Sequence, residues 1–112
     1  MMTNFNRALE QVDVIVTPTT GLTAPAIPQA ALLHGESDLT TLTEIMRFTT
    51  QANFTGLPAI SFPAGYNEAG LPIGMQAIGR AWQEQILLRL ALAAEQTVER
   101  QAPQMYYEIL AE

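Results

Sequence analysis

The chain has 112 residues, enough for one domain with a hydrophobic core, and 48% of them are apolar whereas only 14% are charged. The net charge of −6 disfavours binding to the phosphates of nucleic acids. The absence of cysteine and lysine excludes disulfides, thiol catalysis, Schiff-base lysines and Walker-type phosphate loops.

The first elements predicted are a short helix, a strand and a long loop. We expect the helix over residues 4–11 and a buried strand over 12–16, which is mostly β-branched. Pro18 ends this strand because it cannot donate a ladder hydrogen bond. Residues 20–37 are rich in proline, glycine, alanine and threonine, which predicts a long loop with a short turn around 30–33.

A helix is predicted after this loop. Thr41 and Glu44 have the spacing of a capping box, and Asp38 offers an alternative N-cap. Apolar and small residues then follow at helical spacing: Leu42, Ile45, Met46, Thr49 and Ala52. Asn53 and Gly56 suit the C-terminal exit, because both residue types tolerate a positive φ.

Glycine and proline frame the next two strands. The tripeptide Gly-Leu-Pro occurs at 56–58 and again at 70–72, each time before an apolar run. Strands over 59–62 and 73–78, joined by a turn-rich loop, predict an antiparallel hairpin. Gly74 lies inside the second strand, which predicts a bulge or the close approach of another backbone. This local pattern favours a sheet frame over a ligand-binding loop.

The last predicted helix covers residues 83–100 and is apolar most of the way round, which indicates burial on more than one side. The tail 103–112 is expected to pack through Met105, Tyr106, Tyr107 and Ile109. Together these elements predict an α/β fold, with a small mixed sheet of about three strands and flanking helices. We expect residues 1–112 to form a single domain.

Candidate catalytic residues are sparse. A Ser-His-Asp triad is formally available from His34 with Ser37 or Ser61 and with Asp13 or Asp38. Ser61 does not lie in a G-x-S-x-G elbow, and His34 shares a loop with Ser37, where fixed geometry is hard to maintain. We therefore favour His34 as a solvated loop residue and expect no catalytic residue in this chain.

No metal site, cofactor site or membrane segment is predicted. Glu95 and Glu99 lie one helical turn apart, but such pairs usually form a solvated face, and there is no G-x-G-x-x-G fingerprint. The longest apolar run, 86–94, contains Arg89 and is far shorter than the roughly 20 residues of a membrane span. The polar start is unlike a signal peptide. We expect a soluble, cytoplasmic protein with no cofactor, nucleic acid or membrane partner.

Several spaced motifs together resemble amidase-signature hydrolases. Residues 53–65 read NFTGLPAISFPAG and resemble the family's N-x-x-G-x-P-x-x-x-x-P-x-G run. Residues 70–76 read GLPIGMQ, and residues 78–84 read IGRAWQE, which is similar to the family's I-G-R-x-x-x-E helix start. The strand and T-P-T at 12–19 are also similar. The resemblance covers roughly residues 8–100, in the order found in the C-terminal region of the family, which includes glutamyl-tRNA amidotransferase A subunits and general amidases.

This resemblance implies part of a large mixed α/β sheet flanked by helices, from an enzyme that hydrolyses amides. The family's Ser-cisSer-Lys triad lies in its earlier, N-terminal part. This sequence has no match to that part and contains no lysine, so the resemblance implies a segment that is inactive alone.

The resemblance also implies a role in the substrate pocket. In the amidotransferase A subunits an acidic residue shortly before the N-x-x-G motif reads the substrate amino acid. The matching position here falls near apolar Met46, and Glu44 is close but points elsewhere on a helix. This favours a general amidase with an apolar pocket, for which we name Met46, Phe48 and Asn53; a helix C-cap explains Asn53 equally well.

Three functional hypotheses follow. The first is a C-terminal amidase segment, either truncated or one half of a split enzyme that binds an amidase N-terminal segment or subunit. The second is a free-standing structural or interaction module that kept the scaffold and lost the chemistry. Both leave a sheet edge uncovered, so we expect a homo-oligomer if no other partner covers it. The third, an independent hydrolase using Ser61 and His34, is the least favoured.

Overall fold

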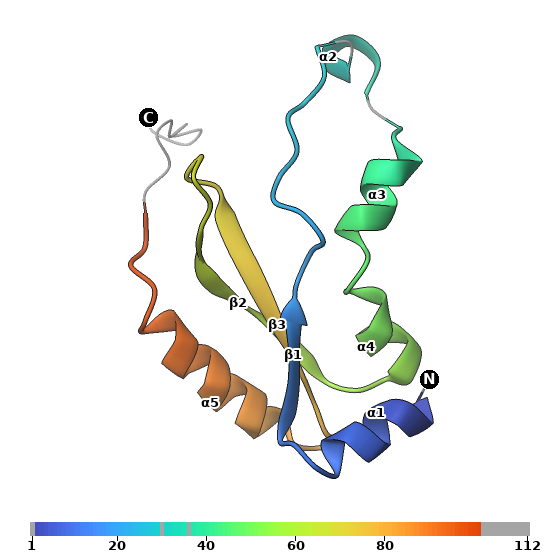
Figure 1. The fold of residues 1–112 in the computed structure, drawn as a ribbon, viewed down its shortest axis with the longest axis vertical. Helices are drawn as coiled ribbons and strands as arrows, with labels where there is room; N and C mark the ends of the chain where they lie inside the picture. Colours follow the sequence, from blue (N-terminus) through green and yellow to red (C-terminus); the bar gives the residue numbers. More distant parts are fainter. Residues whose placement is uncertain (1, 30, 36, 102–112) are drawn as a thin grey trace, which may run out of the picture.

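The computed structural model describes residues 2–29, 31–35 and 37–101, without the side chains of Leu32 and His34. The described elements are, in chain order, α1 (Met2–Leu9), β1 (Val14–Pro18), α2 (Ala31–His34), α3 (Leu39–Ile45), α4 (Thr50–Thr55), β2 (Ala59–Tyr66), β3 (Pro72–Gly79) and α5 (Glu84–Glu95) (Figure 1). The predicted packing of Met105, Tyr106, Tyr107 and Ile109 lies outside the described residues.

The three strands form one sheet in the order β1-β3-β2. Three predictions are therefore confirmed: the α/β class, the number of strands, and the antiparallel hairpin formed by the two strands that follow the Gly-Leu-Pro tripeptides. The sheet is not mixed, however: β3 pairs antiparallel with both β1 and β2. The loop between β2 and β3 is too short for the crossover that a parallel pair requires, and β1 runs alongside β3 in the opposite direction.

The first strand is shifted by two residues from its predicted position and is not buried throughout. β1 includes Thr17 and Pro18, and Val16 is exposed to solvent. Val16 pairs with Ala77 on the face where α5 lies, but α5 packs mainly along β2 and β3 and leaves β1 at the edge of the sheet uncovered. Pro18 is accommodated because an edge strand has N–H positions that no neighbour uses.

The single helix predicted after the long loop is broken in two. α3 begins with Asp38 as its N-cap, so the alternative cap is used rather than the capping box of Thr41. The chain then turns over residues 46–49 before α4 begins. Gly56 is left-handed, with φ of 66°, and ends α4 as predicted, whereas Asn53 lies inside α4 and is not its C-cap.

The β2–β3 hairpin is irregular where Pro63 faces Gly74. The register shift lies on β2, between Pro63 and Gly65. Gly74 instead permits close packing: a Cβ there would lie 3.1 Å from the Thr19 hydroxyl oxygen. The sequence predicted either a bulge at Gly74 or the close approach of another backbone. Gly74 is instead approached by the side chain of Thr19, and the bulge lies on β2.

Hydrophobic packing lies on both faces of the sheet. On one face Ala77 is buried and Gly79 contacts Leu87 of α5, which packs along β2 and β3. Because side chains alternate along a strand, Ile78 points to the other face, where it forms a cluster with Leu9 and Leu57. Ala52, Phe5 and Ile15 pack against this cluster, so α1 and α4 cover that face in part.

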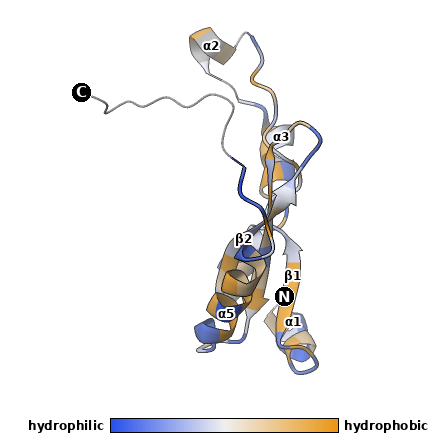
Figure 2. Cartoon of the chain, turned by 90° about the vertical axis from the view of Figure 1, so that its left-hand side faces the viewer, coloured by the Kyte–Doolittle hydropathy of each residue, from blue (hydrophilic) through white to orange (hydrophobic). Residues whose placement is uncertain are grey.

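Helix α5 ends at Glu95, before the predicted end at residue 100. The side chains of Leu88 and Leu92 on this helix are exposed. Much of the α5 ribbon carries the hydrophobic colour in Figure 2. The predicted burial of this helix on more than one side is not found within the described residues, where Leu87 is its buried side chain. None of the described helices is both long and apolar enough to traverse a bilayer.

The molecule divides into a body and an arm. The body consists of α1, the sheet, α4 and α5. The arm, by which we mean the described residues between 20 and 49, rises away from the sheet through α2 and returns through α3 (Figure 1). Its apolar side chains are largely exposed: Ile27 is 74%, Leu33 82% and Leu39 71% accessible. The body buries its core, whereas the arm presents hydrophobic side chains to solvent.

Candidate functional site

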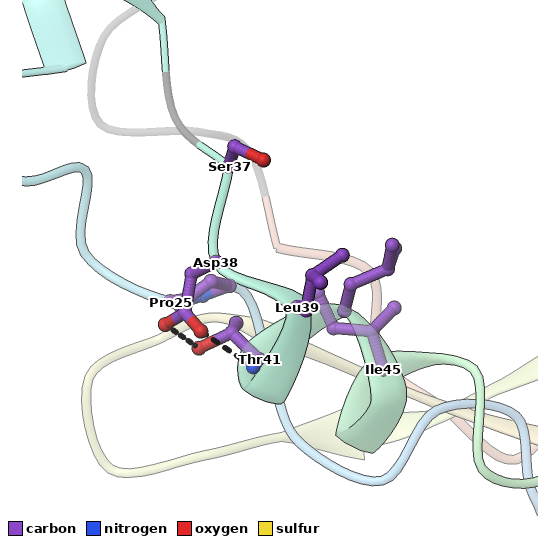
Figure 3. Close-up of a pocket in the computed structure, with 7 residues that line it drawn as sticks. Pro25, Ser37, Asp38, Leu39, Thr41 and Ile45 are labelled. Carbon is purple, nitrogen blue, oxygen red and sulfur yellow. Dashed lines mark hydrogen bonds between the residues drawn. The ribbon is translucent and has the colours of Figure 1, made fainter.

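The arm contains a groove beside α3. This groove has a volume of about 320 Å³. It is lined by Pro25, Ser37, Asp38, Leu39, Thr41, Leu42 and Ile45. Figure 3 shows Leu39 and Ile45 projecting from the helix, with Asp38 and Thr41 together at its first turn. The groove therefore has an apolar side formed by α3 and a polar end formed by its N-cap.

Asp38 directs its charge at the helix rather than at the groove. One carboxylate oxygen accepts hydrogen bonds from the backbone N–H groups of Thr40 and Thr41, at 2.9 and 3.2 Å, and the other accepts from the Thr41 hydroxyl at 2.7 Å. These donors, above all the Thr41 hydroxyl, hold the pKa of Asp38 below its ordinary value. Three of the roughly four acceptor sites of this carboxylate are used on the helix, and most of the groove's free surface is apolar, with Leu39, Leu42 and Ile45 among its lining residues, which suits an apolar group.

A polar row crosses the middle of the sheet on the face opposite α5. Thr17, Gln76 and Ser61 are direct neighbours on the three strands. The Gln76 amide nitrogen donates to the Thr17 hydroxyl at 3.0 Å and to the Phe48 carbonyl at 2.6 Å. Gln76 is only 6% exposed, so this amide links the central strand to the end of the arm from a buried position.

A second cavity lies where this row meets the segment that follows β1. The hydroxyls of Thr19 and Ser61 are 2.7 Å apart, and Ser61 also lies within hydrogen-bond distance of the Met75 carbonyl, at 3.3 Å. The cavity has a volume of about 360 Å³ and is lined by Thr19, Thr20, Ser61, Phe62, Pro63, Pro72, Ile73 and Gly74. Its polar groups are neutral hydroxyls, which can orient a ligand but carry no charge.

None of the three predicted pocket residues lines either cavity. Met46 is the C-cap of α3 and is exposed, next to groove residue Ile45. Phe48 is half-buried in the turn and contributes its carbonyl to Gln76. Asn53 is exposed on α4. The structure thus places Met46 and Phe48 in the turn that follows α3 and Asn53 on the next helix.

The described residues give Ser61 no general base. Its hydroxyl contacts Thr19 and a backbone carbonyl, and neither group removes a proton at neutral pH. Asp13 pairs instead with Arg80, at 3.4 Å. The side chain of His34 lies outside the described part of the structure, so the candidate pair of Ser61 and His34 remains a hypothesis. Among the described side chains, no three His, Asp or Glu residues gather as a metal site would require.

Sequence reasoning missed the residues that organise this region. Gln76 stood out only as part of a motif, and Thr19 only as the end of a T-P-T element. Their partners, Phe48 and Ser61, lie 28 and 42 positions away. The alignment of the three strands is the one feature that could have indicated these contacts. Once the register of β1, β2 and β3 is known, Thr17, Ser61 and Gln76 lie side by side in one row.

Two kinds of curated protein are similar to nearly the whole chain. It is 51% identical to a fatty acid amide hydrolase from Medicago truncatula, over 98% of this chain and 18% of that protein. It is 39% identical to the A subunit of the glutamyl-tRNA(Gln) amidotransferase of Parvibaculum lavamentivorans, over 94% of this chain and 20% of that protein. The chain therefore spans about a fifth of the length of the curated relatives it matches.

Solved structures are also similar to this chain, again over about a fifth of their own length. The A subunit of the glutamyl-tRNA(Gln) amidotransferase from Thermotoga maritima matches with a TM-score of 0.71 and 37% identity, over 87% of this chain and 20% of that one. A 6-aminohexanoate cyclic dimer hydrolase matches with a TM-score of 0.68 and 29% identity, over 85% of this chain and 21% of that one. The family model described as Amidase matches residues 1–88. By sequence and by fold, this chain belongs to the amidase family.

Proposed function

We propose that this chain forms the C-terminal scaffold and part of the substrate-pocket wall of an amide-bond hydrolase with an apolar acyl substrate, and that it does not cleave the bond alone. The observation that carries the proposal is the groove on α3, where aliphatic side chains form the wall and the one carboxylate caps the helix. Such a surface fits a hydrocarbon chain better than a charged amino acid.

The residue inventory supports inactivity in isolation. The resemblance to amidase-signature hydrolases implies a Ser-cisSer-Lys triad, and these 112 residues contain no lysine. Ser61 has a threonine and a carbonyl as its described neighbours, so it lacks an activating base there. The catalytic groups must then come from another segment or subunit of the amidase fold, and we expect that segment to cover the exposed apolar side chains of the arm.

The relatives support the choice of substrate. The 51% identical relative is named a fatty acid amide hydrolase, whereas the amidotransferase relative is 39% identical. Met46 is apolar where the resemblance leads us to expect the acidic residue of the amidotransferases. Both points favour a fatty acyl amide over an amino acid as the substrate of the complete enzyme.

The proposal is tested by reconstitution. The chain is co-expressed with an amidase-family N-terminal segment from the same genome, and the hydrolysis of long- and short-chain fatty acyl amides is measured for each part and for the mixture. We expect activity only in the mixture, with preference for the long chain. Turnover by the chain alone, or a mixture that hydrolyses only amino acid amides, would contradict the proposal.

A matched pair of variants tests the groove in the same assay. Leu42→Gln places an amide in the groove, and Thr40→Gln places the same side chain on an exposed part of α3 outside it. We expect Leu42→Gln to lower kcat/KM for the long-chain amide by about tenfold and Thr40→Gln to leave it unchanged. Equal effects of the two variants would mean that the groove does not hold the acyl chain.

The sheet favours one alternative, a free-standing oligomeric module. Among the described strands β1 and β2 are both edges, because β3 lies between them, and unpaired edges attract further strands. This alternative predicts a homo-oligomer of the isolated chain and no binding to an amidase N-terminal segment. Sedimentation of the isolated chain and of the mixture separates it from the first proposal.

A further inference from the structure

We infer that Gln76 is a positioning residue: it holds the turn of residues 46–49 against the sheet and thereby fixes the end of the acyl groove. The inference rests on the proposed function for its effect on substrate, but not for its effect on the turn. On this inference Gln76 influences which acyl chain the groove accepts, although Gln76 itself does not line the groove.

The geometry of the Gln76 amide is the first step. A primary amide has two N–H hydrogens, and the Gln76 nitrogen has two acceptors within reach, the Thr17 hydroxyl at 3.0 Å and the Phe48 carbonyl at 2.6 Å. One acceptor belongs to the neighbouring strand β1 and the other to the turn. Because the side chain is buried, water does not readily replace either bond, so the two bonds together fix how far the turn lies from the sheet.

The turn's own hydrogen bonds fix its shape but not its place. Thr49 donates to the Met46 carbonyl from both its backbone N–H, at 3.2 Å, and its hydroxyl, at 3.1 Å. The backbone N–H of Arg47 donates to the Glu44 carbonyl at 3.3 Å. These bonds are all local and would move with the turn as a unit. The Gln76 bond connects that unit to the central strand of the sheet.

A second attachment explains why a shift of the turn would reach the groove. The backbone N–H of Gly21 donates to the Glu44 carbonyl at 3.1 Å, which holds the end of α3 against the segment leaving β1. A shift at Phe48 therefore pivots α3 about this point, and Leu42 and Ile45 of the groove wall move with the helix. Gln76 does not line the groove, yet it sets the position of the element that does.

Two Gln76 variants and one matched control separate this role from general support of the fold. Gln76→Glu keeps the size of the side chain but replaces the donor with an oxygen that repels the Phe48 carbonyl, and Gln76→Met removes the donor without adding charge. Thr17→Val removes the other acceptor of the same amide and leaves the link to Phe48 intact. All three disturb the polar row, but only the Gln76 variants release the turn.

The first measurement uses the whole 112-residue chain and needs no activity. Hydrogen exchange of the backbone amides at residues 46–51 should accelerate by about fivefold in Gln76→Met and at least as much in Gln76→Glu, while exchange in β3 changes little. Thr17→Val should leave exchange at 46–51 unchanged. Equal acceleration by Thr17→Val, or acceleration spread uniformly over the sheet, would overturn the positioning role.

The second measurement uses the reconstituted hydrolase. Gln76→Met should raise KM for the long-chain amide by about fivefold, leave kcat nearly unchanged and leave short-chain hydrolysis almost intact. A lowered kcat for both substrates, or no change in KM despite faster exchange of the turn, would overturn the control of selectivity. If no mixture is active, the proposed function fails while the exchange experiment still decides the positioning role.

Discussion

The body and the arm of this molecule use hydrophobic residues in opposite ways. In the body, Leu9, Leu57 and Ile78 are buried against one another between the sheet and its helices. In the arm, Ile27 and Leu39 are mostly exposed although they are no less apolar. The body contains its own core, although Phe54, Leu88 and Leu92 are exposed on it, whereas no described apolar side chain of the arm is fully buried. Such an exposed apolar surface gains stability when another surface covers it.

This contrast bears on the function proposed for the chain. The polar attachments of the arm are few and specific: Gln76 holds the turn at 46–49, and the Asn67 side chain donates to the Thr23 hydroxyl at 3.2 Å. Such bonds orient an element without burying much area, which suits a wall that is completed by a second surface. We therefore expect substitutions of core residues in the body to change stability, and substitutions of exposed apolar residues in the arm to change binding.

The largest predicted effect breaks the core of the body. Ile78→Ala should destabilise the chain by about 2–5 kcal/mol, because the side chain is 1% exposed and its loss leaves a cavity between Leu9 and Leu57. Ile27→Ala in the arm is the control and should change the free energy of unfolding by less than about 0.5 kcal/mol. Denaturant titration followed by circular dichroism measures both. Similar losses for the two variants would mean that the arm shares the core.

The sequence predicted the body better than the arm, for a physical reason. Pro72 begins β3 and Gly79 ends it, and their effect on backbone geometry is local, so the hairpin was found. The end of β2 was predicted wrongly at residue 62, because the strand continues through Pro63 and Gly65 to Tyr66 by way of the bulge. The break between α3 and α4 was missed because the apolar spacing through Met46 and Thr49 continues as if one helix ran on. The break is supported by the buried hydrogen bond from Gln76, which no local pattern encodes.

The candidate site was predictable only in part. Met46 and Phe48 were chosen from the resemblance and lie in the turn after α3, outside the lining of the groove, and the groove itself needs Pro25 from a distant segment of the arm. The contact of Thr19 with Ser61 depends on a register that the sequence alone leaves open. A lysine-dependent catalytic triad could be excluded from the sequence, because the absence of lysine is a fact of composition. The position of a binding site could not be predicted in the same way.

The next prediction concerns the junction of the two regions. In Gly21→Ala the new Cβ would overlap the Glu44 carbonyl oxygen, a backbone atom that cannot turn aside. We expect a loss of about 1–3 kcal/mol and faster hydrogen exchange in α3. Gly74→Ala is the comparison in the sheet, where the nearest atom is the Thr19 hydroxyl, which can rotate, so the loss should be smaller. The reverse order would mean that the arm is not closed at its base by Gly21.

A smaller change, this time an increase in stability, is expected from a substitution at an exposed site of the body. Trp82 has a positive φ of 64°, and its side chain is 89% exposed. The segment before it is held in place by Arg80, whose guanidinium donates to the Leu9 and Val12 carbonyls, each at 2.8 Å. Trp82→Gly relieves the backbone strain and should raise stability by up to about 1 kcal/mol. Thermal unfolding measures the change. A loss of stability would show that an exposed apolar side chain of the body also contributes to packing, which would blur the contrast with the arm.

The smallest predicted effect is confined to the arm and depends on pH. The pKa of folded Asp38 lies below its ordinary value of 3.8, so the charged cap stabilises α3 fully above that value and loses its effect as the pH falls through the lower, folded pKa. The amide resonances of Thr40 and Thr41, which donate to this carboxylate, should shift in an NMR titration from about pH 6 to about pH 2 while those of β3 stay in place. Asp38→Asn keeps an accepting oxygen without a titrating group and should flatten the response. An unchanged titration in that variant would assign the acid sensitivity to another group, and a simultaneous shift in β3 would show that arm and body unfold together.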